Sequence, residues 1–98
     1  MFEHFEWDPD KNIANINKHG ISFDEASTVF EDPEALYKPD TEHSDSEDRF
    51  VIIGFSESSR LLMVCHCYRE SETVIRIISA RKATKSELAE YGGNYNER

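Results

Sequence analysis

Apolar residues recur with a helical period near the start of the chain and alternate with a strand-like period in its second half. Asp8 and Pro9 are typical of a helix start, and Gly20, which follows two basic residues, is typical of a helix end. These signals predict a first helix whose inner face carries Ile13 and Ile16.

A second helix is predicted directly after the first. Ser22 and Glu25 have the spacing of a capping box, and the dipeptide Asp32-Pro33 should end the helix. Apolar residues recur at helical spacing between these signals, namely Phe23, Ala26, Val29 and Phe30. The pattern also allows two short strands, one over residues 5–7 and one over residues 35–38.

Three longer strands follow in the second half of the chain. They are predicted over residues 49–56, 60–69 and 73–81. Their two links are short enough for antiparallel hairpins. Thr84 and Glu87 form another capping box, which begins a last helix that Gly92-Gly93 should end. We therefore predict an α+β fold with two N-terminal helices, an antiparallel sheet of three to four strands with helices on one face, and a C-terminal helix.

Strict alternation along the last strand divides its side chains between two faces. Ile75, Ile77, Ser79 and Arg81 then share one face, and Arg76 emerges among the apolar residues of the other face. An unpaired charge among apolar residues is costly. Arg76 is therefore expected to meet a carboxylate, a ligand or an open cleft.

The length of 98 residues predicts one domain, residues 1–98, with an ordered core over about 5–91 and a loose tail over 94–98. No apolar run approaches the roughly 18 residues that span a bilayer, and no apolar signal segment follows the first residue. We therefore expect a cytoplasmic protein that does not contact the membrane.

Cys65 and Cys67 lie two residues apart on one face of a predicted strand, with His66 on the opposite face. A metal site would need a second pair of ligands, and none is evident elsewhere in the sequence. Reduced cysteines in the core are the preferred interpretation. We predict no metal and no cofactor.

The net charge of −9 is unevenly distributed. Residues 1–59 hold 4 cations and 15 anions, whereas residues 60–98 hold 7 cations and 5 anions. Between Arg60 and Lys85, 6 cations stand against 2 anions, so this segment can attract phosphate. The acidic first part opposes nucleic-acid binding and would suit a basic protein partner.

Motifs in a specific order and spacing cover residues 5–91, nearly the whole chain. They are Phe5-Glu6-Trp7-Asp8-Pro9 with Lys11 and Asn15, Lys18-His19-Gly20, Ser22-Phe23 with Glu25-Ala26, Val29-Phe30, Asp32-Pro33, His43-Ser44 with Glu47 and Arg49, Ile53-Gly54, and Arg76-Ile77-Ile78-Ser79-Ala80-Arg81 with Ala83, Glu87 and Tyr91. In these motifs the chain resembles the BrnT toxin family of bacterial type II toxin–antitoxin systems.

The resemblance implies a RelE-like fold and a ribonuclease that slows growth by cutting RNA. It also implies a BrnA-like antitoxin, a DNA-binding protein that masks the toxin and represses the shared operon. DNA would be contacted only through this antitoxin, in an assembly that is a heterotetramer by analogy with other toxin–antitoxin pairs. The acidic total charge is a departure, since toxins that cut RNA are commonly basic.

Metal-independent cleavage of RNA needs proton transfer at two oxygens and stabilisation of negative charge on the phosphate. Guanidinium groups suit the second task because they hold two phosphate oxygens at once. Our candidates are Arg69, Arg76 and Arg81, with Lys82 and Lys85 adding attraction for RNA. The alternative for Arg76 and Arg81 is an internal ion pair with Glu47 or Glu87.

The sequence leaves the acid–base partner open. His66 could exchange protons near neutral pH, or it could be a histidine of the core or surface. His19 is a candidate through the resemblance, although a cation at a helix C-terminus is favourable in itself. His4 and His43 are expected to be solvated.

Four further residues are candidates for the site. Glu47, a catalytic candidate, and Arg49, an RNA-binding candidate two residues away, could form a pair that orients an arginine at the site, or a simple surface pair. Trp7 could stack on a base or pack beside the first helix. Tyr91 could bind phosphate or anchor the last helix. The predicted function is a metal-independent ribonuclease toxin; the alternative is a non-catalytic domain that pairs with an antitoxin and modulates operon repression.

Overall fold

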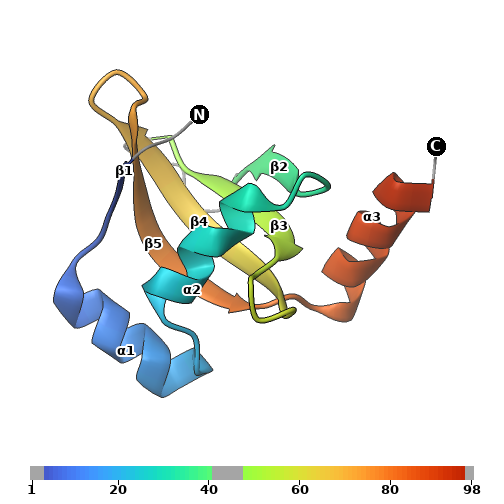
Figure 1. The fold of residues 1–98 in the computed structure, drawn as a ribbon, viewed down its shortest axis with the longest axis horizontal. Coiled ribbons are helices and arrows are strands. Elements are labelled where there is room, and N and C mark those ends of the chain that lie inside the picture. Colours follow the sequence, from blue (N-terminus) through green and yellow to red (C-terminus); the bar gives the residue numbers. More distant parts are fainter. Residues whose placement is uncertain (1–3, 41–47, 97–98) are drawn as a thin grey trace.

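The computed structural model describes residues 4–40 and 48–96. In chain order its elements are β1 (His4–Glu6), α1 (Pro9–His19), α2 (Phe23–Thr28), the 3₁₀ turn η1 (Val29–Glu31), β2 (Leu36–Pro39), β3 (Phe50–Phe55), β4 (Leu61–Arg69), β5 (Val74–Lys82) and α3 (Lys85–Asn96). The class predicted from the sequence, α+β with a helix at the C-terminus, is confirmed (Figure 1).

The sheet has five strands in the order β1-β5-β4-β3-β2. Strands β2 to β5 pair antiparallel, and both predicted hairpins are present. β1 pairs parallel with β5, so the sheet has one strand more than the predicted three to four, and one of its pairings is not antiparallel. A strand of three residues carries too little alternation for its partner to be predicted.

Local capping explains where the helices begin. The Asp8 carboxylate accepts a hydrogen bond from the Asp10 amide at 2.8 Å, and the Ser22 hydroxyl accepts one from Glu25 at 3.0 Å. Gly20 ends α1 with φ +73°. The prediction that Gly92-Gly93 ends α3 was wrong, because the helix continues to Asn96.

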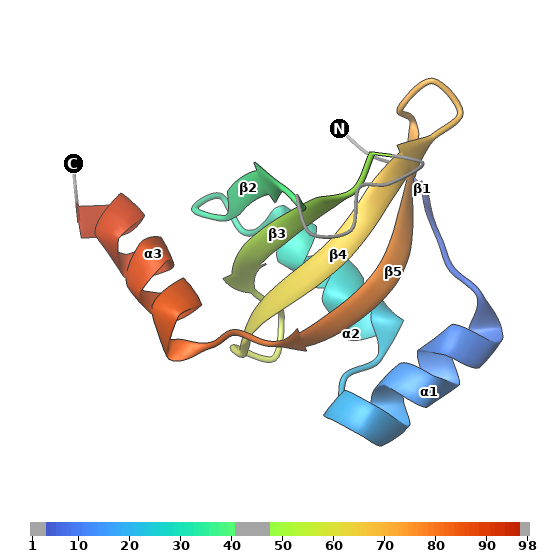
Figure 2. The ribbon, with the colours of Figure 1, turned by 180° about the vertical axis from the view of Figure 1, so that it is seen from behind.

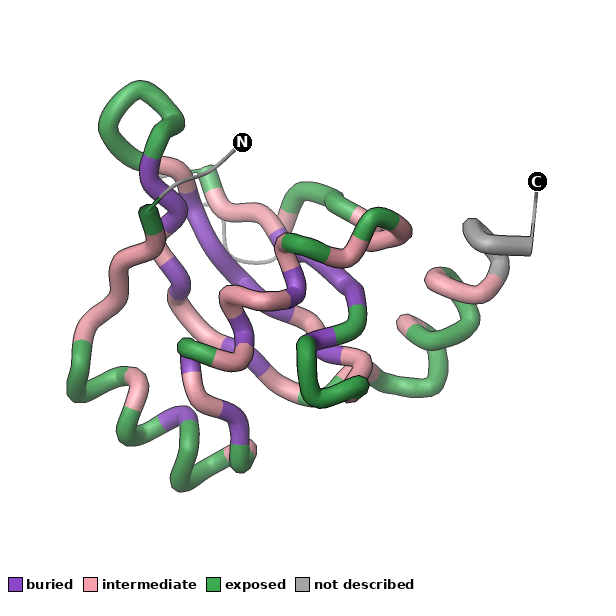
Figure 3. Tube along the Cα trace, in the orientation of Figure 1, coloured by how far each residue is buried: buried purple, intermediate pink, exposed green. Residues whose placement is uncertain are grey.

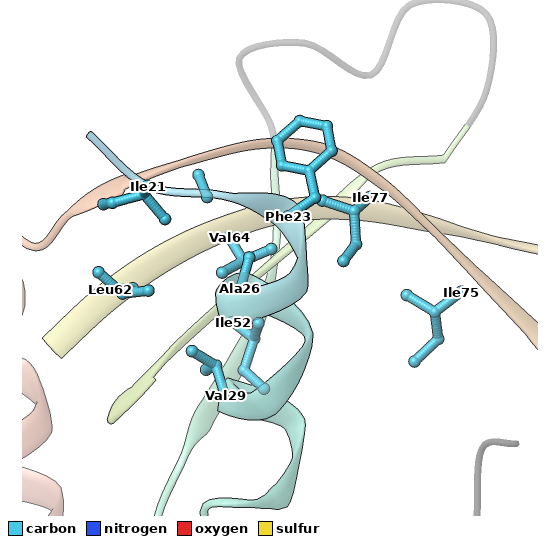
Figure 4. Close-up of a cluster of buried hydrophobic side chains, with 10 residues drawn as sticks. Ile21, Phe23, Ala26, Val29, Ile52, Leu62, Val64, Ile75 and Ile77 are labelled. Carbon is cyan, nitrogen blue, oxygen red and sulfur yellow. The ribbon is translucent and has the colours of Figure 1, made fainter. Parts of the chain in front are cut away.

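The core lies between α2 and the sheet. Phe23 and Ala26 on α2 and Val29 at the start of η1 face buried residues of the strands (Figure 4). Beneath Val29, the sheet carries Gly54, where a Cβ would lie 3.1 Å from Val29 Cγ1 and 3.0 Å from Ala35 Cβ. Glycine therefore allows η1 to approach the sheet closely.

α1 presents the opposite face from the one predicted. Ile13 is 57% exposed and Ile16 is 41% exposed, whereas Asn15 is buried. The Asn15 amide donates to the carbonyls of Ile21 and Ala80 at 2.9 Å, and its oxygen accepts from the Ala80 amide at 3.2 Å. β1 pairs with only the first three residues of β5, so further along this edge the Asn15 side chain takes the place of a neighbouring strand.

Replacing Asn15 by Ala should destabilise the fold by about 2 kcal/mol, because it leaves buried backbone groups of Ile21 and Ala80 without their partner. Denaturant unfolding measures this loss directly. Asn17→Ala, at an exposed position of the same helix, is the control and should change stability by about 0.5 kcal/mol or less. Equal losses in the two variants would contradict the bridging role of Asn15.

The sequence predicted that the helices cover one face of the sheet, and this was wrong for α3. α1 and α2 lie on one side, whereas α3 stands beside the β2–β3 end (Figures 1 and 2). Its Tyr91 ring meets Phe55 edge-on at 5.3 Å, and its hydroxyl donates to Asp32 at 2.8 Å. The sheet face opposite α2 is therefore only partly covered by helices.

Candidate functional site

A β-bulge decides which side chains of β5 share a face. Cys65 pairs with Ser79, but the next residue, His66, pairs with Ile77, so Ile78 is the extra residue. The bulge turns Ser79 and Arg81 to the face opposite the core, the same face as Arg76, and turns Ala80 inward. The predicted strict alternation was therefore wrong beyond Ile77.

A cleft of about 610 Å³ opens on the sheet face that is turned away from α2. The end of α1, strands β2 to β5 and the start of α3 all contribute to it. Its lining consists of Lys18, His19, Lys38, Pro39, Asp40, Arg49, Val51, Met63, Cys65, Ile78, Ser79, Ala80, Arg81 and Glu87.

The cleft brings together three predicted site residues, His19, Arg49 and Arg81. Two further cations, Lys18 and Lys38, also line it and were not predicted as site residues. Lys18 lies inside one of the motifs, but Lys38 reaches the cleft only because β2 pairs with β3. Four cationic side chains there stand against two carboxylates, of Asp40 and Glu87.

Arg81 lies at the junction of β5 and α3. Its two terminal nitrogens donate to the two oxygens of Glu87 at 2.8 and 2.9 Å, the bidentate geometry that a phosphate can also take. These hydrogen bonds from Arg81 hold the pKa of the Glu87 carboxyl below its usual range. The ion pair with Glu87, which was the alternative for Arg81, is thus present, and it lies at the wall of the cleft.

Arg76 and Arg69 lie elsewhere. Both donate to one carboxylate oxygen of Glu6, Arg69 from Nε at 2.9 Å and Arg76 from a terminal nitrogen at 3.0 Å. Glu6 belongs to β1, at the opposite end of β5 from Arg81. The three arginines therefore form two separate groups, and Arg76 has the carboxylate partner that its position required.

His66 is a core residue, which was its alternative interpretation, and it does not line the cleft. It has no exposed surface and lies among the rings of Phe30, Phe50 and Tyr68, with centroid distances of 4.8, 6.3 and 5.3 Å. Its Nε2 lies 3.3 Å from the Tyr68 hydroxyl and its Nδ1 lies 3.2 Å from the Val64 carbonyl. Burial lowers the pKa of His66 to about 4, so the ring is neutral near pH 7.

His66 should make stability depend on pH. The pKa of His66 is about 6.5 in the unfolded chain and about 4 in the folded chain, so the unfolded chain binds the proton at a higher pH. The stabilisation is thus complete above pH 6.5 and falls as the pH drops towards 4, by roughly 3 kcal/mol at most. Replacing His66 by Phe should remove this component, measured as the difference between the two proteins in denaturant unfolding at pH 7 and 4.5. If the free energy of unfolding changes equally between pH 7 and 4.5 in both proteins, a neutral buried His66 is contradicted.

Four further candidates lie outside the cleft. Trp7 packs edge-on against Phe23 at 6.0 Å, as its core alternative predicted, and Tyr91 anchors α3. Lys82 and Lys85 are exposed but do not line the cleft. Glu47 lies outside the described residues, as does His43.

Both cysteines are buried free thiols, as predicted. Burial raises the pKa of the Cys65 thiol to about 12, so this wall of the cleft carries a neutral thiol and not a thiolate. Within residues 4–40 and 48–96, His, Cys, Asp and Glu form no group of three or more that could hold a metal ion.

Comparison with known proteins identifies the family. The model of a family described as the ribonuclease toxin BrnT of type II toxin–antitoxin systems matches residues 7–87. The chain belongs to the BrnT family. The resemblance inferred from the motifs is thereby confirmed, and with it the prediction of a ribonuclease toxin.

A solved BrnT structure supports the assignment. The crystal structure of the Brucella abortus ribonuclease toxin BrnT matches with a TM-score of 0.64 and 26% sequence identity, covering 85% of this chain and 100% of that one. A search among curated proteins gave no match. In the described part of the chain, no helix is long and apolar enough to cross a membrane.

Proposed function

We propose that this BrnT toxin cuts RNA in the cleft between the end of α1, the sheet and α3, without a metal ion. The observation that supports the proposal is the convergence of a histidine and four cationic side chains on one concave site. Arg49 and Arg81 would hold the phosphate, with Lys18 and Lys38 adding positive potential.

His19 is the candidate for proton transfer. It lies in the last turn of α1, next to Lys18, and both side chains line the cleft. Attack of the ribose 2′-OH on phosphorus requires removal of its proton, and departure of the 5′-oxygen requires a proton. An imidazole that reaches the phosphate beside the guanidinium of Arg81 could serve either step.

The partner is proposed to be a BrnA-like antitoxin that neutralises the toxin and contacts operator DNA. Cleavage of RNA by unbound toxin would inhibit growth in the cytoplasm. The assembled pair would be a heterotetramer. Membership of a type II toxin–antitoxin family supports the existence of an antitoxin partner.

A second function, a non-catalytic domain that only pairs with the antitoxin, is favoured by two observations. Arg81 is already paired with Glu87, and the chain carries a net charge of −9, which opposes RNA binding. Expression without antitoxin separates the two functions: a catalytic toxin arrests growth, and a substitution in the cleft relieves the arrest.

The direct test is cleavage of RNA by the purified chain with and without EDTA. We expect the same products and about the same rate in both, since the phosphate would be held by side chains of the protein. Loss of cleavage on chelation, restored by a divalent ion, would contradict metal independence. If RNA stays intact under every condition, the catalytic function is contradicted and the non-catalytic function of pairing with the antitoxin is favoured.

A further inference from the structure

A second surface, around Asp32, differs from the cleft in charge and composition. The Asp32 carboxylate accepts hydrogen bonds from the Phe55 amide at 2.8 Å and from the Tyr91 hydroxyl at 2.8 Å. It thereby joins the end of η1 to β3 and to α3, which stands beside this end of the sheet in both views (Figures 1 and 2). Asp32 lies at the centre of this second surface.

Apolar side chains are exposed around this centre. Of the five large hydrophobic residues exposed in the described part of the chain, three lie here: Tyr37 at 51%, Phe55 at 41% and Leu88 at 53%. Phe55 contacts the Tyr91 ring at 5.3 Å, and Leu88 lies one turn before Tyr91 on the same side of α3. The negative charge of Asp32 reaches Tyr37, where burial first and that charge second raise the pKa of the phenol.

Carboxylates lie close along the chain to these apolar residues and to Asp32. Glu31 and Glu34 flank Asp32 along the chain, Glu57 follows Phe55 by two residues, and Glu90 precedes Tyr91. With Asp32 they make five carboxylates against two cations: Lys85, which lies one turn before Leu88 on α3, and Lys38, which pairs with Glu90 at 3.0 Å. Arg60, near Glu57, is paired with Glu25. We call these residues, with Tyr37, Phe55, Leu88 and Tyr91, the Asp32 surface (exposure along the chain is coloured in Figure 3).

We infer that the Asp32 surface binds a cationic segment of the antitoxin whose apolar side chains pack on Phe55 and Leu88. Charge complementarity selects this occupant: RNA phosphate is repelled by five carboxylates, whereas lysine and arginine side chains are attracted. Aromatic and aliphatic groups inside a charged rim have the composition of a protein interface. The other exposed apolar pair, Ile13 and Ile16, has Lys11 and Asp10 beside it and shows no such bias.

The inference rests on the toxin–antitoxin function proposed above, but it places antitoxin binding beside the cleft that would hold RNA, with Lys38 at the border between the two. α3 connects the two places. Its Glu87 meets Arg81 at the cleft, and its Tyr91, one turn later, meets Asp32. Binding of antitoxin and cleavage of RNA should therefore be separable by substitution.

The test measures the affinity of purified full-length chain for the antitoxin of its own operon, at about 0.15 M salt. Two variants alter the Asp32 surface: the charge reversal Glu31→Lys/Glu57→Lys, and Leu88→Ser. Each should weaken binding by about tenfold or more. Each has a matched control at an exposed position elsewhere, Glu70→Lys/Glu72→Lys in the β4–β5 turn and Ile13→Ser on α1, which should leave the affinity within about threefold.

RNA cleavage by each variant, measured without antitoxin, is the companion experiment and should remain that of the unmodified chain. Unchanged antitoxin affinity in both surface variants overturns the inference, as does an equal loss in the matched controls. A loss confined to Ile13→Ser would place the partner on α1 and also overturns it. If the unmodified chain cuts no RNA, the proposed catalytic function fails, while the affinities still decide where the antitoxin binds.

Discussion

Replacing Arg81 by Ala should lower the rate of RNA cleavage by about 10²–10³-fold, the usual cost of removing one preorganised donor to a transition-state anion. Arg81 lines the cleft, and its guanidinium is already oriented by the two oxygens of Glu87. A phosphate that enters the cleft would meet a donor whose orientation is fixed before binding. Single-turnover rates at saturating RNA measure the effect on the chemical step.

Glu87→Gln is the control that separates catalysis from architecture. It removes the negative charge from the pair while leaving Arg81 in place and an oxygen for the Thr84 amide, which Glu87 now caps at 2.9 Å. If Arg81 binds phosphate, cleavage should remain within about threefold or rise, because the competing anion is gone. If the pair only fixes α3, both substitutions should lose activity together and lower stability together.

Signals that act within a few residues were predicted well. Asp8, Ser22 and Thr84 cap helices because a side-chain oxygen reaches an amide two or three residues away, which requires no knowledge of the rest of the fold. The order of the three long strands followed from their hairpin links in the same way. The α+β class could thus be predicted from local chemistry.

Errors arose where distant parts of the chain compete for a residue. Ile13 and Ile16 have the spacing of an inner helix face, but the open edge of β5 needs hydrogen-bond partners, and Asn15 supplies them at Ala80. The helix therefore buries the side-chain amide of Asn15 and exposes Ile13 and Ile16. No pattern within α1 indicates that a strand 65 residues later in the chain will lack a neighbour there.

The arginines illustrate the same limit for the site. A period of two places Arg76 and Arg81 on opposite faces, and one extra residue at Ile78 places them on the same face. Yet Arg76 lies near the start of β5, where it pairs with Glu6, while Arg81 lies near its end, and the cleft gains Lys38 and Arg49 through the pairing of β2 with β3. The sequence supplied the residue types, whereas bulge and pairing decide which of them meet.

Replacing His19 by Ala should have the second large effect, a loss of at least about 10²-fold in cleavage rate if its imidazole transfers a proton in the rate-limiting step. Of the histidines in the described residues, His4 lies on β1 away from the cleft and His66 lies in the core, so His19 is the one that lines the site. Binding of RNA should change much less, because Lys18, Arg49 and Arg81 remain.

Free imidazole gives this prediction a sharper test than the loss of activity alone. The cleft is open, so added imidazole can occupy the space left by the His19 side chain and should restore part of the rate in His19→Ala. Imidazole should not restore the rate of Arg81→Ala, because this variant has lost a phosphate-binding charge and still has the imidazole of His19. His4→Ala, at an exposed position on β1, controls for unspecific effects and should cut RNA normally. If His19→Ala retains full activity, His19 does not transfer a proton. Its role would then be structural, as a cation that is favourable at the C-terminus of α1.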